Sequence, residues 1–137
     1  MDIKAFKMDG LGNDFVIIDN RQKVTELSKE QIIKICDRNF IGCDQLIFIE
    51  KDNTADARVK FFNSDGGESG ACGNGTRCVA NLISKENGKN NIILTTLSRN
   101  LKSLINSFAY ILNILSISSP HPLLRKRSFV FCSILFL

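Results

Sequence analysis

Two absences narrow the chemistry open to this 137-residue chain. It has one histidine, His121, and none of its five cysteines lies in a C-x-x-C motif. Structural zinc sites usually combine closely spaced Cys and His ligands, so such a site is disfavoured. A Cys–His hydrolase is disfavoured as well, because the sole histidine lies far along the chain. An odd number of cysteines without a secretory signal also argues against a disulfide framework.

Acidic residues are missing from the C-terminal part of the chain. Residues 1–86 hold all 14 acids against 12 Lys and Arg, whereas residues 87–137 hold six basic residues and no acid. Such asymmetry is typical of a tail that binds nucleic acid or membranes. This segment, however, is apolar and rich in serine, which fits neither a solvated basic arm nor a groove that follows phosphates. We therefore expect no nucleic-acid partner.

Long hydrophobic runs are also missing. The apolar stretch SFVFCSILFL has about half of the roughly 20 residues that a membrane-spanning helix needs. The opening residues, MDIKAFKMDG, contain no apolar core of a signal peptide. We expect a cytoplasmic protein without a membrane partner.

Local patterns predict alternating strands and helices up to residue 96. Ser28 and Gln31 form a capping-box pattern at the start of one helix. The sequence DGLGND predicts a long loop within a hairpin. The predicted strands are 3–8, 15–19, 45–50, 57–63 and 91–96, and the predicted helices are 28–38 and 73–85, the latter with one apolar stripe.

The pattern degrades beyond Thr96. Asp and Glu vanish, Ser, Leu and Ile dominate, and no periodicity is sustained. We expect a domain over residues 1–96 followed by an aberrant apolar and basic tail over 97–137. A frameshift or a truncation explains such a tail, and a genuine C-terminal extension is the alternative.

One glycine-rich stretch, FFNSDGGESGACGNGTRCVA over residues 61–80, holds the most specific pattern. It lacks the Lys-Ser/Thr pair of a P-loop and the spacing of a G-x-G-x-x-G motif, so phosphate binding is disfavoured. A purely structural turn is the plain alternative. The cysteine in its middle, Cys72, favours chemistry instead.

Cys72 falls at the start of the helix predicted over 73–85. Free backbone N–H groups and the helix dipole favour a thiolate at that point. Gly73 and Gly75 leave those N–H groups open to a ligand carboxylate. A thiolate beside an anion-binding helix start suits proton abstraction next to a carboxylate, with the backbone donors stabilising the charge that develops. Cys78 lies within the apolar stripe, and we expect it to be a buried, inert thiol.

Three segments carry a resemblance to a known family. They are FKMDGLGNDFVIID, CDRNFIGCDQLIF and FFNSDGGESGACGNGTRCVANLI, which together span about residues 3 to 95. In these segments the chain resembles the N-terminal half of diaminopimelate epimerase. The resemblance implies an α+β fold, in which a mixed sheet curls around a central helix and forms one of two similar halves.

The resemblance also implies an activity and a set of site residues. The family interconverts LL- and meso-diaminopimelate in lysine and peptidoglycan precursor synthesis, with two cysteines as bases and neither pyridoxal phosphate nor a metal. Cys72 matches one of these bases. The matching substrate-binding positions are Asn13, Gln45, Asn63, Gly73 and Asn74. The family's homodimer remains an open expectation for this chain.

Three departures from the family pattern limit what we expect of the chain alone. The family usually shows a G-I-G-A-D-Q run where this chain has F-I-G-C-D-Q, and one residue near Ile41 is missing. Such a deletion would shift Gln45 out of register. No motif of the second catalytic cysteine is found, and Cys132 lacks its neighbours. The tail after residue 96 also departs from the family. We therefore expect a truncated epimerase that is inactive on its own.

Other interpretations of the sequence stay open. The main alternative is a non-catalytic fold remnant or a module that binds an amino acid. A membrane-associated tail and a relative of proline racemase or of the phenazine-pathway isomerases are weaker alternatives.

Overall fold

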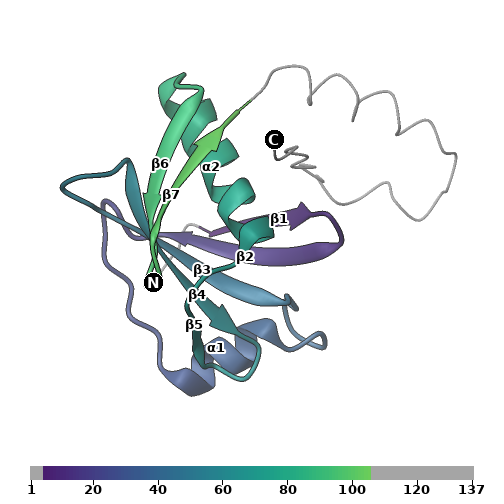
Figure 1. Ribbon diagram of the computed structural model, residues 1–137. Helices are drawn as coiled ribbons and strands as arrows, with labels where there is room; N and C mark the ends of the chain where they lie inside the picture. The colour runs from purple at the N-terminus through teal and green to yellow at the C-terminus, as the bar shows by residue number, and fades with distance from the viewer. Residues whose placement is uncertain (1–4, 106–137) are drawn as a thin grey trace, which may run out of the picture.

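The computed structural model describes residues 5–105, which form a mixed β-sheet with a helix on each face. Figure 1 shows the sheet curling around the longer helix, α2. The strands are β1 (Ala5–Gly10), β2 (Asn13–Asp19), β3 (Gln45–Glu50), β4 (Ala57–Asn63), β5 (Glu68–Ser69), β6 (Asn91–Thr95) and β7 (Asn100–Leu104), and the helices are α1 (Lys29–Cys36) and α2 (Gly73–Asn87).

The strand order is β1-β2-β3-β4-β6-β7, and the short β5 pairs with β4 outside this path. Strand β2 runs parallel to β3, and β4 runs antiparallel to β3 and parallel to β6. Both kinds of pairing therefore occur in one sheet. The observed arrangement confirms the predicted α+β class with a curled mixed sheet.

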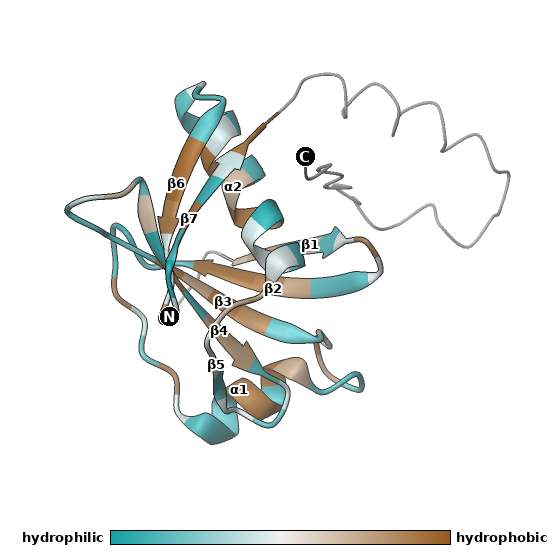
Figure 2. Ribbon diagram, in the orientation of Figure 1, coloured by the Kyte–Doolittle hydropathy of each residue, from teal (hydrophilic) through white to brown (hydrophobic). Residues whose placement is uncertain are grey.

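Central strands are apolar on both faces because a helix covers each face. In β2, Phe15 and Ile17 belong to the core cluster under α2. Their neighbours Val16 and Ile18 belong to a second cluster, which contains residues of α1. A strand buried on both sides reads as a continuous hydrophobic run, and Figure 2 shows such runs in the middle of the sheet.

Both helices start where their sequences predict, whereas α1 ends at Cys36 instead of residue 38 and α2 ends at Asn87 instead of residue 85. Ser28 caps α1 with a complete capping box, in which Gln31 N donates to Ser28 Oγ and Gln31 Oε1 accepts from Ser28 N. Helix α2 begins after Cys72, and its C-cap residue is Gly88. The φ of Gly88 is 73°, the left-handed conformation common at helix C-termini.

The first hairpin corrects one expectation from the sequence. DGLGND does not form a long loop, because Gly10 already pairs with Asn13 and only Leu11 and Gly12 lie between the strands. Both turn residues have positive φ, 51° and 89°, which matches the twist of a two-residue hairpin. The tight turn fixes Asn13 as the first residue of β2.

Regular structure continues past residue 96. Strand β7 pairs with β6 over five residues, and Ile105 N donates to Asn90 O at 2.8 Å. The rest of the expected tail, with His121 and Cys132, lies outside the described residues. Between residues 5 and 105, no helix is long and apolar enough to cross a membrane.

Candidate active site

Three of the predicted site residues lie at one end of the sheet. Asn13 begins β2, Gln45 begins β3 and Asn63 ends β4. Because β2 and β3 are parallel and β4 is antiparallel to them, these three strand ends lie on the same side of the sheet. Gln45 is the direct cross-strand partner of Asn63 in the register, and its Nε2 donates to Asn63 Oδ1 at 2.8 Å.

The start of α2 packs against this end of the sheet. A Cβ added to Gly75 would come within 2.8 Å of Ile47 Cδ1 and 2.9 Å of Phe61 Cε1. Ile47 lies two residues after Gln45, and Phe61 lies two residues before Asn63. Because glycine has no side chain, Gly75 allows the start of α2 to approach the strands that carry the site residues.

Cys72 is the N-cap residue of α2. Its Sγ accepts a hydrogen bond from Gly75 N at 3.4 Å, and its carbonyl oxygen accepts from Thr76 N at 2.8 Å. The side chain is half-buried and packs against the core under α2. The predicted position at the helix start is therefore correct, and the sulfur accepts from one backbone N–H there.

Cys78 is fully buried one and a half turns further along the helix. This confirms that its thiol is buried, as the apolar stripe predicts.

Asn13 and Asn74, two of the predicted substrate-binding residues, contact each other. Asn74 Nδ2 donates to Asn13 Oδ1 at 2.8 Å, which joins the start of α2 to the first hairpin. Gly73 is exposed, and a Cβ added to it would meet no atom within 4 Å. The structure thus links Asn13 to Asn74 and Gln45 to Asn63, and it leaves Gly73 open.

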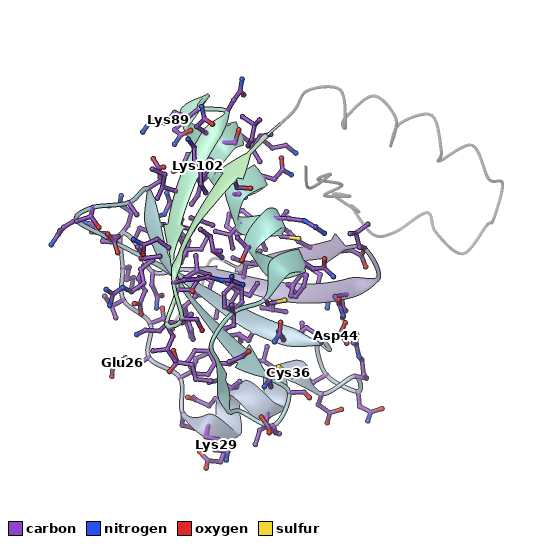
Figure 3. The ribbon with its side chains drawn as sticks, in the orientation of Figure 1. Glu26, Lys29, Cys36, Asp44, Lys89 and Lys102 are labelled. Carbon is purple, nitrogen blue, oxygen red and sulfur yellow. The ribbon has the colours of Figure 1, made fainter. Side chains whose placement is uncertain are left out.

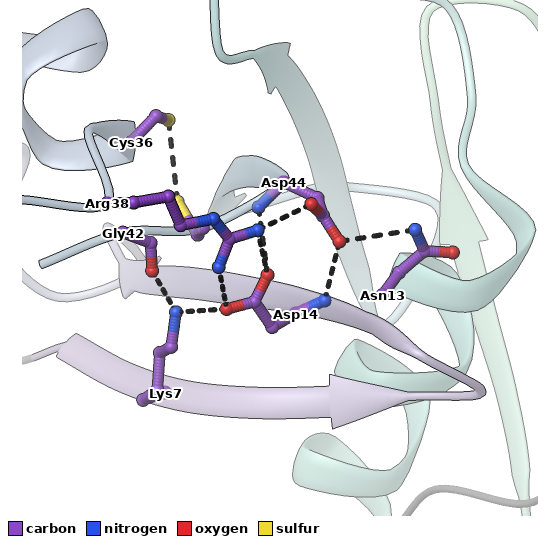
Figure 4. A network of polar contacts seen from close by, with 8 residues as sticks. Lys7, Asn13, Asp14, Cys36, Arg38, Gly42 and Asp44 are labelled. Atoms are coloured by element: carbon purple, nitrogen blue, oxygen red, sulfur yellow. Dashed lines mark hydrogen bonds and ion pairs between the residues drawn. The ribbon is translucent and has the colours of Figure 1, made fainter.

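Sequence reasoning missed a network of charged residues beside Asn13 (Figure 4). Arg38 donates to both carboxylate oxygens of Asp14, at 2.7 and 2.8 Å, and to Asp44 Oδ1 at 2.6 Å. Lys7 Nζ binds Asp14 Oδ2 at 2.7 Å and the carbonyl oxygen of Gly42. The sequence held a signal for this network, because Asp14 and Asp44 are direct sequence neighbours of the predicted site residues Asn13 and Gln45.

Asp14 stays ionised to unusually low pH. Partial burial raises the pKa of its carboxyl, but hydrogen bonds and charges from Arg38 and Lys7 outweigh this effect and hold the pKa well below its usual range. The same contact with Asp14 raises the pKa of Arg38 further.

Two buried thiols, those of Cys36 and Cys43, flank the segment that contains Ile41. The sulfurs of Cys36 and Cys43 lie 3.4 Å apart, and Cys43 N donates to Cys36 O at 3.2 Å. Burial, together with the neighbouring Cys36, raises the pKa of the Cys43 thiol. With this connection Gln45 still pairs with Asn63.

A groove of about 850 Å³ lies beside Asn13, because its lining includes Gly12, Asp14 and Asp44. Strand β1 and helix α2 form much of its wall, through residues that include Phe6, Met8 and Leu82. None of the six predicted site residues lines it. Among residues 5–105, no group of three or more His, Cys, Asp and Glu is placed to hold a metal ion.

Solved structures define the class of fold. A phenazine biosynthesis protein of the PhzF family from Enterococcus faecalis matches with a TM-score of 0.60 and 16% identity, over 78% of this chain and 42% of that protein. A PhzF-family protein from Bacillus anthracis matches with a TM-score of 0.52 and 24% identity, over 76% and 34% of the two chains. The chain thus shares the fold of the matched part of these proteins.

Sequence comparison identifies the family. The diaminopimelate epimerase family profile matches residues 5–107. The Pelagibacter ubique diaminopimelate epimerase is 71% identical over 105 residues, which is 77% of this chain and 38% of that protein. The Phenylobacterium zucineum diaminopimelate epimerase is 50% identical over 91 residues, 66% of this chain and 33% of that protein. The chain belongs to the diaminopimelate epimerase family, a family of isomerases, and spans less than half the length of these relatives.

Proposed function

We propose that residues 5–105 form one half of the active site of a cofactor-independent diaminopimelate epimerase, with Cys72 as one of its two bases. The observation that carries this proposal is the position of Cys72 as the N-cap of α2, with its sulfur at a backbone N–H and the exposed Gly73 next to it. Membership of the family supplies the substrate class.

The proposed step is a proton transfer at the α-carbon of the amino acid. The Cys72 thiolate takes the α-proton and becomes a thiol, while the electron pair of the C–H bond moves toward the substrate carboxylate. Donors at the start of α2 stabilise the charge that develops on the carboxylate oxygens. A second thiol on the opposite face then returns a proton to the carbon and inverts its configuration.

Carboxamide side chains hold the substrate in this proposal. Asn13, Gln45, Asn63 and Asn74 donate and accept hydrogen bonds without competing for the α-proton. Their mutual contacts at 2.8 Å support a site in which the polar ends of an amino acid replace some of these bonds. The partner is therefore a small molecule.

The chain alone is proposed to be inactive. Two-base inversion needs a donor on each face of one carbon, and among the 137 residues only Cys72 lies in an A-C-G sequence. Loss of one member of a catalytic pair removes most of the rate enhancement.

A chimera with the C-terminal part of the Pelagibacter ubique relative tests the proposal. We expect no exchange of the α-proton of diaminopimelate into deuterated water by the chain alone, and measurable exchange and epimerisation by the chimera. Cys72→Ser in the chimera is expected to lower the rate by on the order of 10³-fold or more.

Cys43→Ala is the matched control, because it removes a buried thiol outside the site and is expected to leave the rate near that of the chimera. A folded Cys72→Ser chimera that epimerises at the parental rate contradicts the proposal. Binding of diaminopimelate without exchange in every chimera favours an amino-acid-binding module instead.

A further inference from the structure

A chain of hydrogen bonds with one direction runs through two of the three asparagines of the site, Asn13 and Asn74. Arg77 donates from a terminal guanidinium nitrogen to Asn74 Oδ1 at 2.9 Å, Asn74 Nδ2 donates to Asn13 Oδ1 at 2.8 Å, and Asn13 Nδ2 donates to Asp44 Oδ2 at 3.2 Å. Every link passes from donor to acceptor in the same sense. The Arg77 cation therefore lies at one end of this chain of hydrogen bonds, which we call the relay, and the Asp44 anion lies at the other.

The charged ends decide which way each carboxamide points. An amide group is nearly symmetric in shape, so a flip exchanges its donor and its acceptor at little steric cost. The Arg77 guanidinium has only donors, which forces Asn74 to turn its oxygen toward it. The Asp44 carboxylate has only acceptors, which forces Asn13 to turn its nitrogen toward it. The two inner groups, Asn74 Nδ2 and Asn13 Oδ1, are then left facing each other.

Asp44 is itself held in place from several sides. Its Oδ2 also accepts from Asp14 N at 3.0 Å, and its Oδ1 accepts from Arg38 at 2.6 Å. Arg38 in turn binds both oxygens of Asp14, so the carboxylate is anchored to the first hairpin and to the segment after α1 (Figure 4). A group with this many charge-assisted bonds is a rigid reference point for Asn13.

We propose that Asp44 and Arg77 are positioning residues that fix the polarity of the Asn13–Asn74 pair toward the ligand. This inference rests on the proposed function, because it takes these two asparagines as ligand-binding groups. Asn13 presents an oxygen with a second lone pair, and Asn74 presents a nitrogen with a second hydrogen. The pair therefore suits a zwitterionic amino acid whose ammonium group lies toward Asn13 and whose carboxylate lies toward Asn74.

Nuclear magnetic resonance on the full chain tests the relay without any ligand. The side-chain amide signal of Asn13, identified by its loss in Asn13→Asp, is followed while the pH is lowered until the carboxylates are protonated. We expect the signal to move in the wild type and to move clearly less in Asp44→Asn, where only Asp14 beside Asn13 still titrates. Glu26→Gln is the matched control, since it removes one acidic charge at an exposed position of the β2–α1 loop, away from Asp44 in Figure 3.

Four charged groups besides Asp44 belong to this network or contact it, namely Asp14, Arg38, Lys7 and Arg77. Asp14 titrates in acid as well, so the experiment is repeated in Asp14→Asn, where the Asn13 signal must still move. A signal that does not respond to pH in the wild type overturns the inference, and so does one that moves equally in Asp44→Asn. The wild-type titration can overturn the inference even if a variant fails to fold.

Calorimetry with diaminopimelate separates this inference from the proposed function. We expect Asp44→Asn to weaken binding about tenfold, as for loss of a charge-assisted hydrogen bond that orients a ligand group. Arg77→Lys keeps a donor for Asn74 and is expected to keep most of the affinity, and Glu26→Gln all of it. Absence of binding by the wild type counts against the proposed function. In that case the NMR titration alone tests the chain of hydrogen bonds. Equal binding by wild type and Asp44→Asn overturns the inference.

Discussion

Single residues in this protein take their roles from neighbours that are distant in sequence. Asn13 and Asn74 lie 61 positions apart, yet their carboxamides are hydrogen-bonded. Asp14 meets Arg38 from 24 positions away, in a bidentate contact that keeps the carboxylate ionised below its usual pH range. A sequence motif indicates the role of a residue. The residues that it contacts depend on which strand ends the fold brings together.

Asp14→Asn is expected to make the protein less stable at neutral pH, and by less in acid. The folded-state pKa of Asp14 lies below its ordinary value of 3.8, so its contribution is complete above that value and is lost as the pH falls further. Arg38 is more than half exposed, which limits the expected loss at neutral pH to about 1 kcal/mol. Urea unfolding across the acid range measures this difference. An equal loss at both ends of the range rules out the ionic contribution.

Secondary-structure elements followed the sequence where a local signal was strong. The capping box of α1, the apolar stripe of α2 and the alternation of β4 are all observed. The first hairpin differed, because Leu11 adopts a positive φ that its residue type does not favour. Strand β7 was missed because NLKSL has no strong strand signal of its own, and pairing with β6 supplies its order.

Gly75→Ala and Gly73→Ala are a matched pair within the first turn of α2. A Cβ at Gly75 clashes with Ile47 and Phe61 in the core, so we expect a loss of about 1–3 kcal/mol in the free energy of unfolding. A Cβ at Gly73 meets nothing, so we expect no loss there. Urea denaturation measures both. Equal stability of the two variants contradicts the close packing of the helix start on the sheet.

On the scale of the whole molecule, one sheet joins both helices into three layers. The core under α2 draws on β1, β2, β3, β4 and β6, whereas the cluster that includes α1 residues draws on β2 and β3. Strand β6 pairs with β4 at only two positions, so most of its ladder is made with β7. Strand β7 therefore belongs to the same folded unit as the site.

Two shortened chains test where that unit ends. The expected boundary at residue 96 separates β6 from β7, whereas a chain ending at residue 105 keeps the full ladder and the partly buried Ile105. We expect the chain of 105 residues to be more stable than the chain of 96 residues by on the order of 2 kcal/mol. Circular dichroism during urea unfolding compares the two. Equal stability supports the boundary at residue 96.

The sequence by itself determined the family, the main strands and helices, and the placement of Cys72 at a helix start, because these depend on short motifs and local periodicity. Only the tertiary structure decided which amides contact each other, which charged groups lie at the two ends of that contact, and that β7 pairs with β6. These features arise where the ends of parallel and antiparallel strands meet the start of α2, and such meetings between distant segments leave no periodic pattern in the chain.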